Sequence, residues 1–426
     1  MPPDRLDISR FIPTPRRSLL RQVADLSAEL GSPAYLVGGF VRDALLERPI
    51  NDFDIVIEGD ATKLGRALVK KHGGRVTVHA PFKTATWFPP VEAGSPRPYD
   101  PDNETDFIDL ISARSETYEH PAALPTVKLG SLADDLRRRD FTVNAMAVRL
   151  DGDHFGELTD PLGGRADLER GLVRVLHPNS FVDDPTRLLR AVRYAARYQF
   201  QIESSTEALI PAALPFVDKL SPERLRHELD LIFEEEDSVP MMEKLWELGI
   251  VGQVQPALPS DEATRTRVRG AALVPSAVEN PVHFRWAVWL MGLTPKEIRA
   301  FSKRLHFSAE LLKAASAASS VFADLKSIVS LRPSGCVRRL DGLPADALWA
   351  VSVCAEGEAR SNLETYLKKW KGMKPFATGE TLVEMGVPFG PRVGETLWRL
   401  RAAWLDGEVT SAEGERKLLE KLIGQG

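Results

Sequence analysis

The spacing of apolar and polar residues divides the chain into two regions of different character. Between residues 34 and about 150, short apolar runs such as 35–37 and 53–57 alternate with segments whose apolar positions recur every three or four residues. The short runs are typical of β-strands, and the longer period is typical of helices. From about residue 155 the strand signals fade and helical patterns dominate. The pattern predicts an α/β head with an antiparallel or mixed sheet, followed by an all-α remainder.

The length of 426 residues exceeds that of one typical domain, so we expect several compact units. The predicted segments are a head, a helical neck, a helical body and a helical tail at residues 1–150, 151–255, 256–345 and 346–426. No apolar run reaches the length of a membrane span, and the N-terminal residues lack the hydrophobic core of a signal peptide. These features predict a cytoplasmic protein with no membrane partner. The oligomeric state is left open.

Positive charge is concentrated locally although the net charge of the chain is −5. Arginines cluster in LRRRD at 136–140, along residues 187–197 and in ERLRH at 223–227. Phosphate backbones respond to such local fields and not to the sum over the chain. Composition is therefore compatible with a nucleic-acid partner.

Two aspartates one residue apart, Asp52 and Asp54 in NDFDIVI, are the first candidates for chemistry. Because side chains alternate between the faces of a strand, both carboxylates point to one face while Phe53 and Ile55 point into a core. Carboxylates on a shared face can bind divalent cations, and Mg²⁺ keeps coordination positions for substrate phosphates. The pattern favours a metal site for phosphoryl transfer. The alternative is an edge strand with a solvated face.

A glycine turn precedes these acids. Residues 35–37 run into Gly38 and Gly39, after which FVRDALLE has the pattern of a helix. Glycines allow the backbone to approach phosphate oxygens, and the N–H groups at a helix start attract anions. Arg42, one turn into the helix, can add a charged fork. We expect this turn to contact a triphosphate.

A third acid is expected on a neighbouring strand, and Asp109 in FIDLISAR fits this position. Phe107, Asp109 and Ile111 share one face of the predicted strand, which sets the carboxylate among apolar neighbours. Such a charge is costly unless it is paired or bound to metal. We predict a metal-facing role for Asp109. An ion pair with an arginine such as Arg114 is the alternative.

A charged stripe is predicted on one helix between residues 184 and 197. Its members recur at intervals of three and four, with apolar residues on the other faces; they are Asp184, Arg187, Arg190, Arg193 and Arg197. An acid that accepts and an arginine that donates, one turn apart, can match the base edges of cytosine and adenine. The alternative is a solvated stripe with salt bridges within the helix.

Five segments occur in the order found in a known family: VGGFVRDALLERPINDFDIVI, DDLRRRDFTVNAMAV, DPLGGRADLERGLVRV, DDPTRLLRAVRYAARYQFQIE and LSPERLRHELDLIF. With these motifs the sequence resembles the class II tRNA nucleotidyltransferases and the related bacterial poly(A) polymerases, between residues 35 and about 255. The fourth motif departs slightly, because Asp183 stands where members of the family often have glutamate. The base-selecting position that follows it is intact.

The resemblance implies a nucleotidyltransferase (polymerase β-like) sheet in the head. It implies that Asp52, Asp54 and Asp109 are catalytic ligands of Mg²⁺. The residues implied to bind or support the nucleotide are Gly38, Gly39, Arg42, Arg138, Arg139, Asp140, Asn144, Asp184, Arg187, Arg190 and Arg193. Among them, Asp140 and Asn144 are expected to hold the ribose and the local backbone, although Asp140 is equally suited to cap a helix that starts there.

The implied activity is template-independent addition of C and/or A to the 3′ end of tRNA from CTP and/or ATP, with release of pyrophosphate. The tail is the expected site of tRNA binding. Within this class the chain could add CCA, CC only, A only or a poly(A) tail. A catalytically silent RNA-binding protein on the same scaffold is the alternative outside the class.

Overall fold

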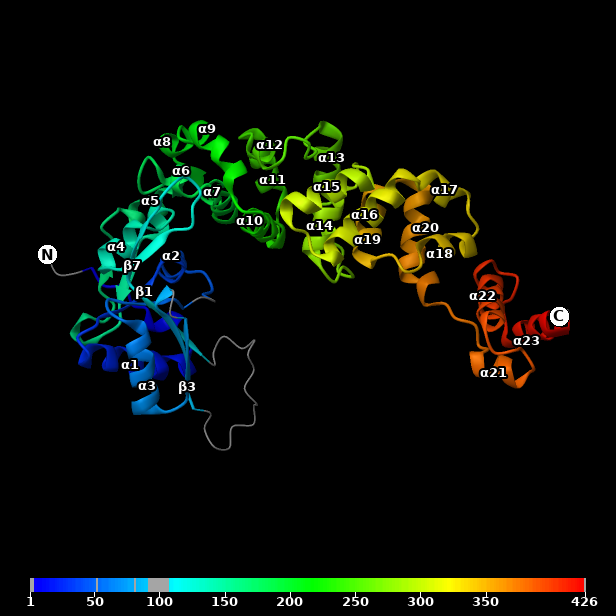
Figure 1. Cartoon of the computed structure of the whole chain (residues 1–426), viewed down its shortest axis with the longest axis horizontal. Coiled ribbons are helices and arrows are strands. Elements are labelled where there is room, and N and C mark those ends of the chain that lie inside the picture. The colour runs from blue at the N-terminus through cyan, green and yellow to red at the C-terminus, as the bar shows by residue number, and fades with distance from the viewer. Residues whose placement is uncertain (1–3, 51–52, 80–81, 91–106, 425–426) are drawn as a thin grey trace. The chain divides into compact units, whose positions relative to one another are not determined.

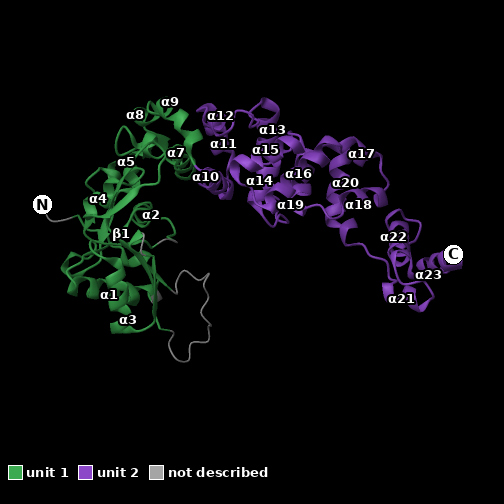
Figure 2. Ribbon diagram, in the orientation of Figure 1, with its two compact units in different colours: residues 1–220 green, residues 221–426 purple. Residues whose placement is uncertain are grey.

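The computed structural model describes residues 4–50, 53–79, 82–90 and 107–424. They fall into two compact units, residues 1–220 and 221–426 (Figure 2). The four predicted segments divide the chain more finely than these units do and remain a prediction.

The first unit is built on a mixed seven-stranded sheet in the order β3-β4-β5-β2-β1-β8-β9. Strands β2 and β5 are parallel, and the other neighbouring pairs are antiparallel. The mixed sheet of the head is thereby confirmed. The strands are β1 (Ala34–Val37), β2 (Ile55–Ile57), β3 (Arg75–His79), β4 (Thr84–Phe88), β5 (Ile108–Ser112), β8 (Ala147–Arg149) and β9 (Leu158–Thr159).

Apolar side chains cover both faces of the central strands. Leu36 and Ile55 belong to the larger core, together with residues of α1 (Thr14–Glu29) and α3 (Ala61–His72). Tyr35 and Val56, the alternate residues of the same strands, pack with Leu132 and Leu136 of α4 (Leu132–Arg137). A strand buried on both faces is apolar at nearly every position, because side chains alternate between the faces. This explains why the strand segments could be recognised as continuous apolar runs.

Helix α4 corrects one alternative drawn from the sequence. Its N-cap is Ser131, which forms a capping box with Asp134, and the helix ends at Arg137. Asp140 therefore follows this helix and does not start it. Its Oδ1 accepts a hydrogen bond of 2.8 Å from the N–H of Phe141, just before the short turn η4 (Thr142–Asn144). The Ser-x-x-Asp capping box formed by Ser131 and Asp134 was the stronger start signal.

The remaining elements of the first unit are short, except for α7. An antiparallel hairpin connects the sheet to α4, with strands β6 (Arg114–Thr117) and β7 (Thr126–Leu129). The helices and strands that follow η4 outside the main sheet are α5 (Gly164–Arg170), β10 (Leu172–Val173), α6 (Ser180–Asp183), α7 (Thr186–Tyr198), β11 (Gln201–Ile202), α8 (Ser204–Glu207) and α9 (Ile210–Ala213).

In its described residues the second unit is helical (Figure 1), as the sequence pattern predicted. Buried Trp286 and Trp289 stack with ring centroids 5.3 Å apart. None of the described helices is both long and apolar enough to cross a membrane. The helices are α10 (Pro222–Glu234), α11 (Val239–Glu247), α12 (Ile250–Val254), α13 (Glu262–Gly270), α14 (Pro281–Leu290), α15 (Pro295–Leu305), α16 (Ala309–Ala323), α17 (Leu325–Ser330), α18 (Pro333–Leu340), α19 (Ala345–Cys354), α20 (Gly357–Lys368), η7 (Trp370–Gly372), α21 (Gly379–Glu384), α22 (Pro391–Leu405) and α23 (Ala412–Gly424).

Candidate active site

Two of the three predicted acids lie at the same end of neighbouring parallel strands. Strands β2 and β5 pair with Ile55 opposite Leu110, and Asp54 and Asp109 are the residues immediately before that pair. Residues in register on neighbouring strands project to the same face of a sheet, about 5 Å apart. The two carboxylates are therefore neighbours. Asp52, the third predicted acid, lies outside the described residues.

The surroundings of Asp109 differ from those predicted. Its side chain is exposed, and its Oδ1 accepts a hydrogen bond of 2.6 Å from the Thr86 hydroxyl on β4. Arg114 pairs instead with Glu116, at 3.0 Å. The predicted alternation of side chains along this strand is confirmed, because Ile108 and Leu110 are buried on the other face. The opposite face is open to solvent at Asp109, however, so neither the apolar setting nor the ion pair with Arg114 is correct.

The acids present fit a magnesium ion. In the described ranges no group of three or more His, Cys, Asp or Glu residues is arranged so that it could hold a metal ion. Mg²⁺ is commonly held by one or two carboxylates plus waters and substrate phosphates, and it prefers hard oxygen ligands. A half-buried Asp54 beside an exposed Asp109 offers such oxygens where a substrate can reach them.

The glycine turn lies at the same edge of the sheet as these acids. Leu36 of β1 is opposite Ile55, so the end of β1 is level with Asp54. Gly38 has φ +62°, and a Cβ there would collide with Nη1 of Arg139. Only glycine combines this φ with room for the guanidinium. A Cβ at Gly39 would meet Arg42 at 3.5 Å, an ordinary contact. Arg139 therefore lies against Gly38, which the sequence motifs alone did not indicate.

Four predicted nucleotide-binding residues are joined in one chain of hydrogen bonds. Arg42 Nη1 donates to Asn144 Oδ1 at 2.6 Å, and Asn144 Nδ2 donates to Asp140 Oδ1 at 3.0 Å. Arg190 donates to Asp140 Oδ2 through Nε at 3.0 Å and through Nη2 at 2.5 Å. The chain links α2 (Gly39–Leu45), η4 and α7. These side chains therefore hold three separate segments of the site in one arrangement.

Asp140 is the centre of this chain and stays ionised. Burial alone would raise the pKa of its carboxyl, but the charge of Arg190 and the hydrogen bonds from Asn144 and Arg190 outweigh it and lower the pKa to about 2. At the other end, Arg42 also donates to both oxygens of Asp43, at 2.9 and 2.8 Å. In this structure Arg42 and Asp140 thus bond to other protein groups, and their contacts with a nucleotide remain predictions.

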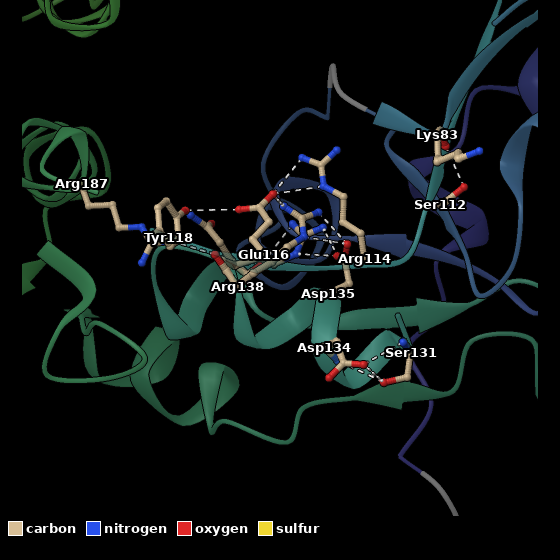
Figure 3. Close-up of polar contacts among 12 residues, drawn as sticks. Lys83, Ser112, Arg114, Glu116, Tyr118, Ser131, Asp134, Asp135, Arg138 and Arg187 are labelled. Atoms are coloured by element: carbon tan, nitrogen blue, oxygen red, sulfur yellow. Dashed lines mark hydrogen bonds and ion pairs between the residues drawn. The ribbon is translucent and has the colours of Figure 1, made fainter. Parts of the chain in front are cut away.

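Arg138 and Arg139 share a single carboxylate, that of Asp135. Figure 3 shows Arg138 beside this carboxylate and Glu116. Asp135 is fully buried; its Oδ1 accepts from Arg138 at 3.0 and 2.6 Å, and its Oδ2 accepts from Arg139 at 3.3 and 3.0 Å. Glu116 of β6 accepts a further bond from Arg138 Nη1 at 3.1 Å. We call Glu116, Asp135, Arg138 and Arg139 the arginine clamp. A buried carboxylate with two cationic partners satisfies the pairing that burial of a charge requires.

The predicted base-selecting pair is not on one helix. Asp184 lies between α6 and α7 in an extended conformation, and its Oδ1 accepts bonds from the N–H and the hydroxyl of Thr186 at 3.1 and 2.7 Å. The single stripe predicted from 184 onward is therefore wrong at its first member. Arg187 is the second residue of α7 and donates to the Ser180 hydroxyl at 2.6 Å and to the Arg138 carbonyl at 2.8 Å.

The arginines of α7 differ in exposure. Arg187 and Arg193 are only 4% and 7% exposed, whereas Arg197 near the end of the helix is exposed. Arg190 pairs with Asp140, fifty positions earlier in the chain. A solvated stripe is therefore the wrong interpretation, and the charged face of α7 packs into the site.

Two members of the arginine clamp, Glu116 and Asp135, were not predicted. The spacing of Asp135 from Arg138 and Arg139, three and four positions along one helix turn, is a signal that could have revealed their pairing. The contact between Glu116 and Arg138 joins two segments 22 positions apart, and no local spacing indicates it.

Comparisons with known proteins cover both units. Residues 34–174 match the family described as the poly A polymerase head domain, and residues 199–261 match the probable RNA and SrmB-binding site of polymerase A. The chain is 33% identical over 408 residues to the A-adding tRNA nucleotidyltransferase of Halalkalibacterium halodurans, covering 93% of this chain and 90% of that protein. It is 32% identical to the CC-adding tRNA nucleotidyltransferase of Geobacter sulfurreducens, with 97% of each chain covered.

A solved structure extends the similarity to three dimensions. The Thermotoga maritima CCA-adding enzyme complexed with tRNA_CCA superimposes with a TM-score of 0.79 and 26% identity, covering 100% of both chains. Similarity of this extent includes both the sheet and the helices that follow it. The protein therefore belongs to the tRNA nucleotidyltransferase family, as its five ordered motifs predicted.

Proposed function

We propose that this chain adds the terminal adenylate to tRNA 3′ ends that finish in CC, with ATP as donor and Mg²⁺ as metal. The adjacency of Asp54 and Asp109 at the ends of two parallel strands carries the chemical part of the proposal. Similarity to an A-adding enzyme over 93% of the chain supports the choice of nucleotide. A tRNA substrate implies a cytoplasmic location.

In the proposed reaction the 3′-hydroxyl oxygen of the tRNA attacks the α-phosphorus of ATP. The bond between that phosphorus and the bridging oxygen breaks, and pyrophosphate leaves. Asp54 and Asp109, with the predicted ligand Asp52, would hold Mg²⁺, which when bound offsets phosphate charge and lowers the pKa of the attacking hydroxyl. Arg139 beside Gly38 would supply positive charge at the triphosphate.

Base selection is assigned to Asp184 and Arg187. An acceptor and a fixed donor match the Watson–Crick edge of adenine, whereas guanine presents a donor and an acceptor in exchanged positions. Arg187 is suited to this role because burial and two hydrogen bonds fix its guanidinium. Because the guanidinium is already fixed, binding of the base does not pay the entropy cost of ordering it. This favours discrimination between adenine and guanine.

A second candidate is addition of CC, alone or followed by A. Similarity to the CC-adding enzyme over 97% of the chain favours this candidate, because the sequence identities to the A-adding and CC-adding relatives, 33% and 32%, are almost equal. The acids and the arginines of the site serve both reactions. The two candidate functions can be distinguished by the nucleotides that the protein adds to tRNA.

The test uses purified protein with tRNA transcripts that end before CCA, after the first C and after CC. Each is incubated with ATP, CTP or both, and product lengths are resolved to one nucleotide. We expect one adenylate on the CC-ending transcript and no extension of the others. Addition of C to the shorter transcripts would establish the second candidate, and a long A tail would indicate poly(A) synthesis. No extension under any condition would favour a silent RNA-binding protein and contradict both.

A further inference from the structure

Arg42 lies beside the glycine turn, where the triphosphate is expected. A Cβ at Gly39 would come within 3.5 Å of its Nη2, and the residue is only 6% exposed. Of the five N–H groups of its guanidinium, three donate to Asp43 and Asn144. The other two take no part in these bonds and can donate to phosphate oxygens. Their direction depends on how the plane of the guanidinium is held.

The aromatic ring of Tyr198, the last residue of α7, lies against this guanidinium. Cζ of Arg42 is 4.5 Å from the centroid of the ring, and Tyr198 is itself only 5% exposed. The face of an aromatic ring carries partial negative charge, so it attracts a cation within about 6 Å, most strongly where water is excluded. Arg48 and Arg197 lie 4.8 and 5.7 Å from the same centroid but are exposed. The attraction is therefore strongest for Arg42.

The hydroxyl of Tyr198 reaches the same guanidinium through Asp43. It donates at 3.2 Å to Asp43 Oδ1, the oxygen that also accepts from Arg42 Nε. The ring is fixed by stacking on Tyr194, with centroids 6.1 Å apart, and by a tilted contact with Phe200 at 5.7 Å. Tyr198 thus contacts both Arg42 and the carboxylate that holds it.

We propose that Tyr198 is a positioning residue for the triphosphate, which orients Arg42 through the face of its ring and through Asp43. The inference rests on the proposed binding of ATP and deepens it, because it concerns recognition of the triphosphate and not of the base. Tyr198 touches no reacting atom in this scheme and acts only through Arg42. Its loss should weaken binding of ATP and leave unchanged the binding of AMP, which has the same base and ribose but a single phosphate.

The central experiment measures equilibrium binding of ATP and AMP to the full chain, with Mg²⁺ and without tRNA. Tyr198→Leu removes the ring and keeps an apolar side chain, whereas Tyr198→Phe removes only the hydroxyl. We expect the preference for ATP over AMP to fall about tenfold in Tyr198→Leu and by less than about threefold in Tyr198→Phe, because the phenylalanine ring still attracts the guanidinium. A loss in Tyr198→Phe as large as that in Tyr198→Leu would contradict the role of the ring.

The second unit contains a matched control. Tyr366 is also buried, and its hydroxyl donates at 2.9 Å to Asp341, which pairs with Arg401 as Asp43 pairs with Arg42. Tyr366→Leu therefore removes a ring from an equivalent arrangement that contains no predicted nucleotide-binding residue. We expect this variant to bind ATP and AMP as wild type does. An equal loss of ATP preference in Tyr366→Leu would overturn the proposal.

Fluorination of the ring separates attraction of the cation from packing. Phenylalanine with one, two or three ring fluorines is incorporated at position 198, and each fluorine withdraws negative charge from the ring face with little change of shape. We expect the preference for ATP over AMP to fall with each added fluorine. This series also provides the test if Tyr198→Leu does not fold. A preference that did not depend on fluorination, or equal losses of ATP and AMP affinity, would show that the ring serves packing alone and would overturn the proposal.

Addition of adenylate to tRNA, measured on the same proteins, separates this inference from the proposed function. If wild type extends no tRNA but ATP binding weakens along the fluorinated series, the proposed reaction is wrong and the role of Tyr198 stands. If wild type adds adenylate and Tyr198→Leu binds ATP as wild type does, the role of Tyr198 is wrong and the reaction stands.

Discussion

Two groups of basic residues, one in each unit, have different surroundings. In the first unit, the arginines of the site are bonded to carboxylates and amides within the fold, as at Asp135 and Asp140. In the second unit, Lys369, Lys371 and Lys374 lie exposed within a stretch of six residues. Paired guanidinium groups fix geometry, whereas exposed ammonium groups attract phosphates at a distance and are screened by salt. Substitutions in the two units should therefore affect different observables.

The lysine segment is nevertheless well anchored through its backbone. Arg401 of α22 donates to the carbonyls of Met373 at 2.9 Å and Lys371 at 3.2 Å, and it pairs with Asp341 at 2.5 Å. The segment thus presents lysines from a fixed backbone. We expect it to contact RNA phosphates without selecting a base.

The largest effect is expected at the acids of the first unit. Asp54→Ala removes one of the two adjacent carboxylates, and we expect nucleotidyl transfer to fall by at least about a thousandfold, because the proposed phosphoryl transfer depends on a metal that these carboxylates would hold. Incorporation of labelled ATP into tRNA is the measurement. Asp25→Ala changes an exposed acid on α1 and should leave activity unchanged. Activity of Asp54→Ala within tenfold of wild type would refute the metal site.

Gly38 of the glycine turn and Gly31, which lies outside it, form a matched pair of sites. Comparing them separates the effect of displacing Arg139 from the effect of backbone strain alone. Gly38 and Gly31 have φ values of +62° and +63°, but only at Gly38 does a Cβ meet a neighbouring side chain, that of Arg139. Gly38→Ala should lower kcat/KM for ATP by about ten- to a hundredfold, and Gly31→Ala should leave it near wild type. Both should lose about 1 kcal/mol of stability from the backbone conformation. Equal kinetic losses would show that displacement of Arg139 has no part in the effect.

The ion pair between Asp140 and Arg190 predicts a dependence of stability on pH. The folded pKa of about 2 lies below the ordinary value of 3.8, so the pair stabilises the fold above about pH 4, and this contribution is lost as pH falls toward about 2. Asp140→Asn should therefore lower the free energy of unfolding by about 2 kcal/mol at neutral pH. Urea unfolding across this range measures the difference between the two proteins. A difference that grew as the pH fell would contradict the ion pair.

The smallest effect is expected in the second unit. Replacing Lys369, Lys371 and Lys374 together by glutamine should raise KM for tRNA by roughly tenfold at low salt and leave kcat unchanged. The effect should shrink as salt is added, because these charges are screened. The same replacement of three exposed lysines elsewhere in the unit, Lys296, Lys303 and Lys313, is the control. A loss of base preference in the first triple variant would break the distinction between the units.

Most of the fold could be predicted from the sequence because its central strands are buried on both faces and its helices are amphipathic. Leu36 faces one core, and Tyr35 and Val56 face the other. Because successive residues of a strand alternate between two apolar cores, every position in the run is apolar. Asp184 shows the limit. Its spacing from Arg187 suits a helix, but the segment breaks between α6 and α7, and Asp184 caps the Thr186 backbone instead.

The site was predicted best where its residues lie at the ends of neighbouring strands. Gly38, Asp54 and Asp109 come together because neighbouring strands align their ends, a relation that strand alternation can anticipate. The openness of the face at Asp109 could not be anticipated, because it depends on which segments cover the sheet. The bond of Glu116 to Arg138 joins two segments that only the folded chain brings together.

The shared carboxylate of Asp135 has a consequence for altering this enzyme. Because its two oxygens bond separately to Arg138 and Arg139, a change at either arginine leaves the other with a partner that is free to shift. Substitutions at these three positions should therefore be strongly non-additive. A variant designed to accept a new base would have to vary residues 135, 138 and 139 together, and libraries that change one position at a time would miss the combinations that work.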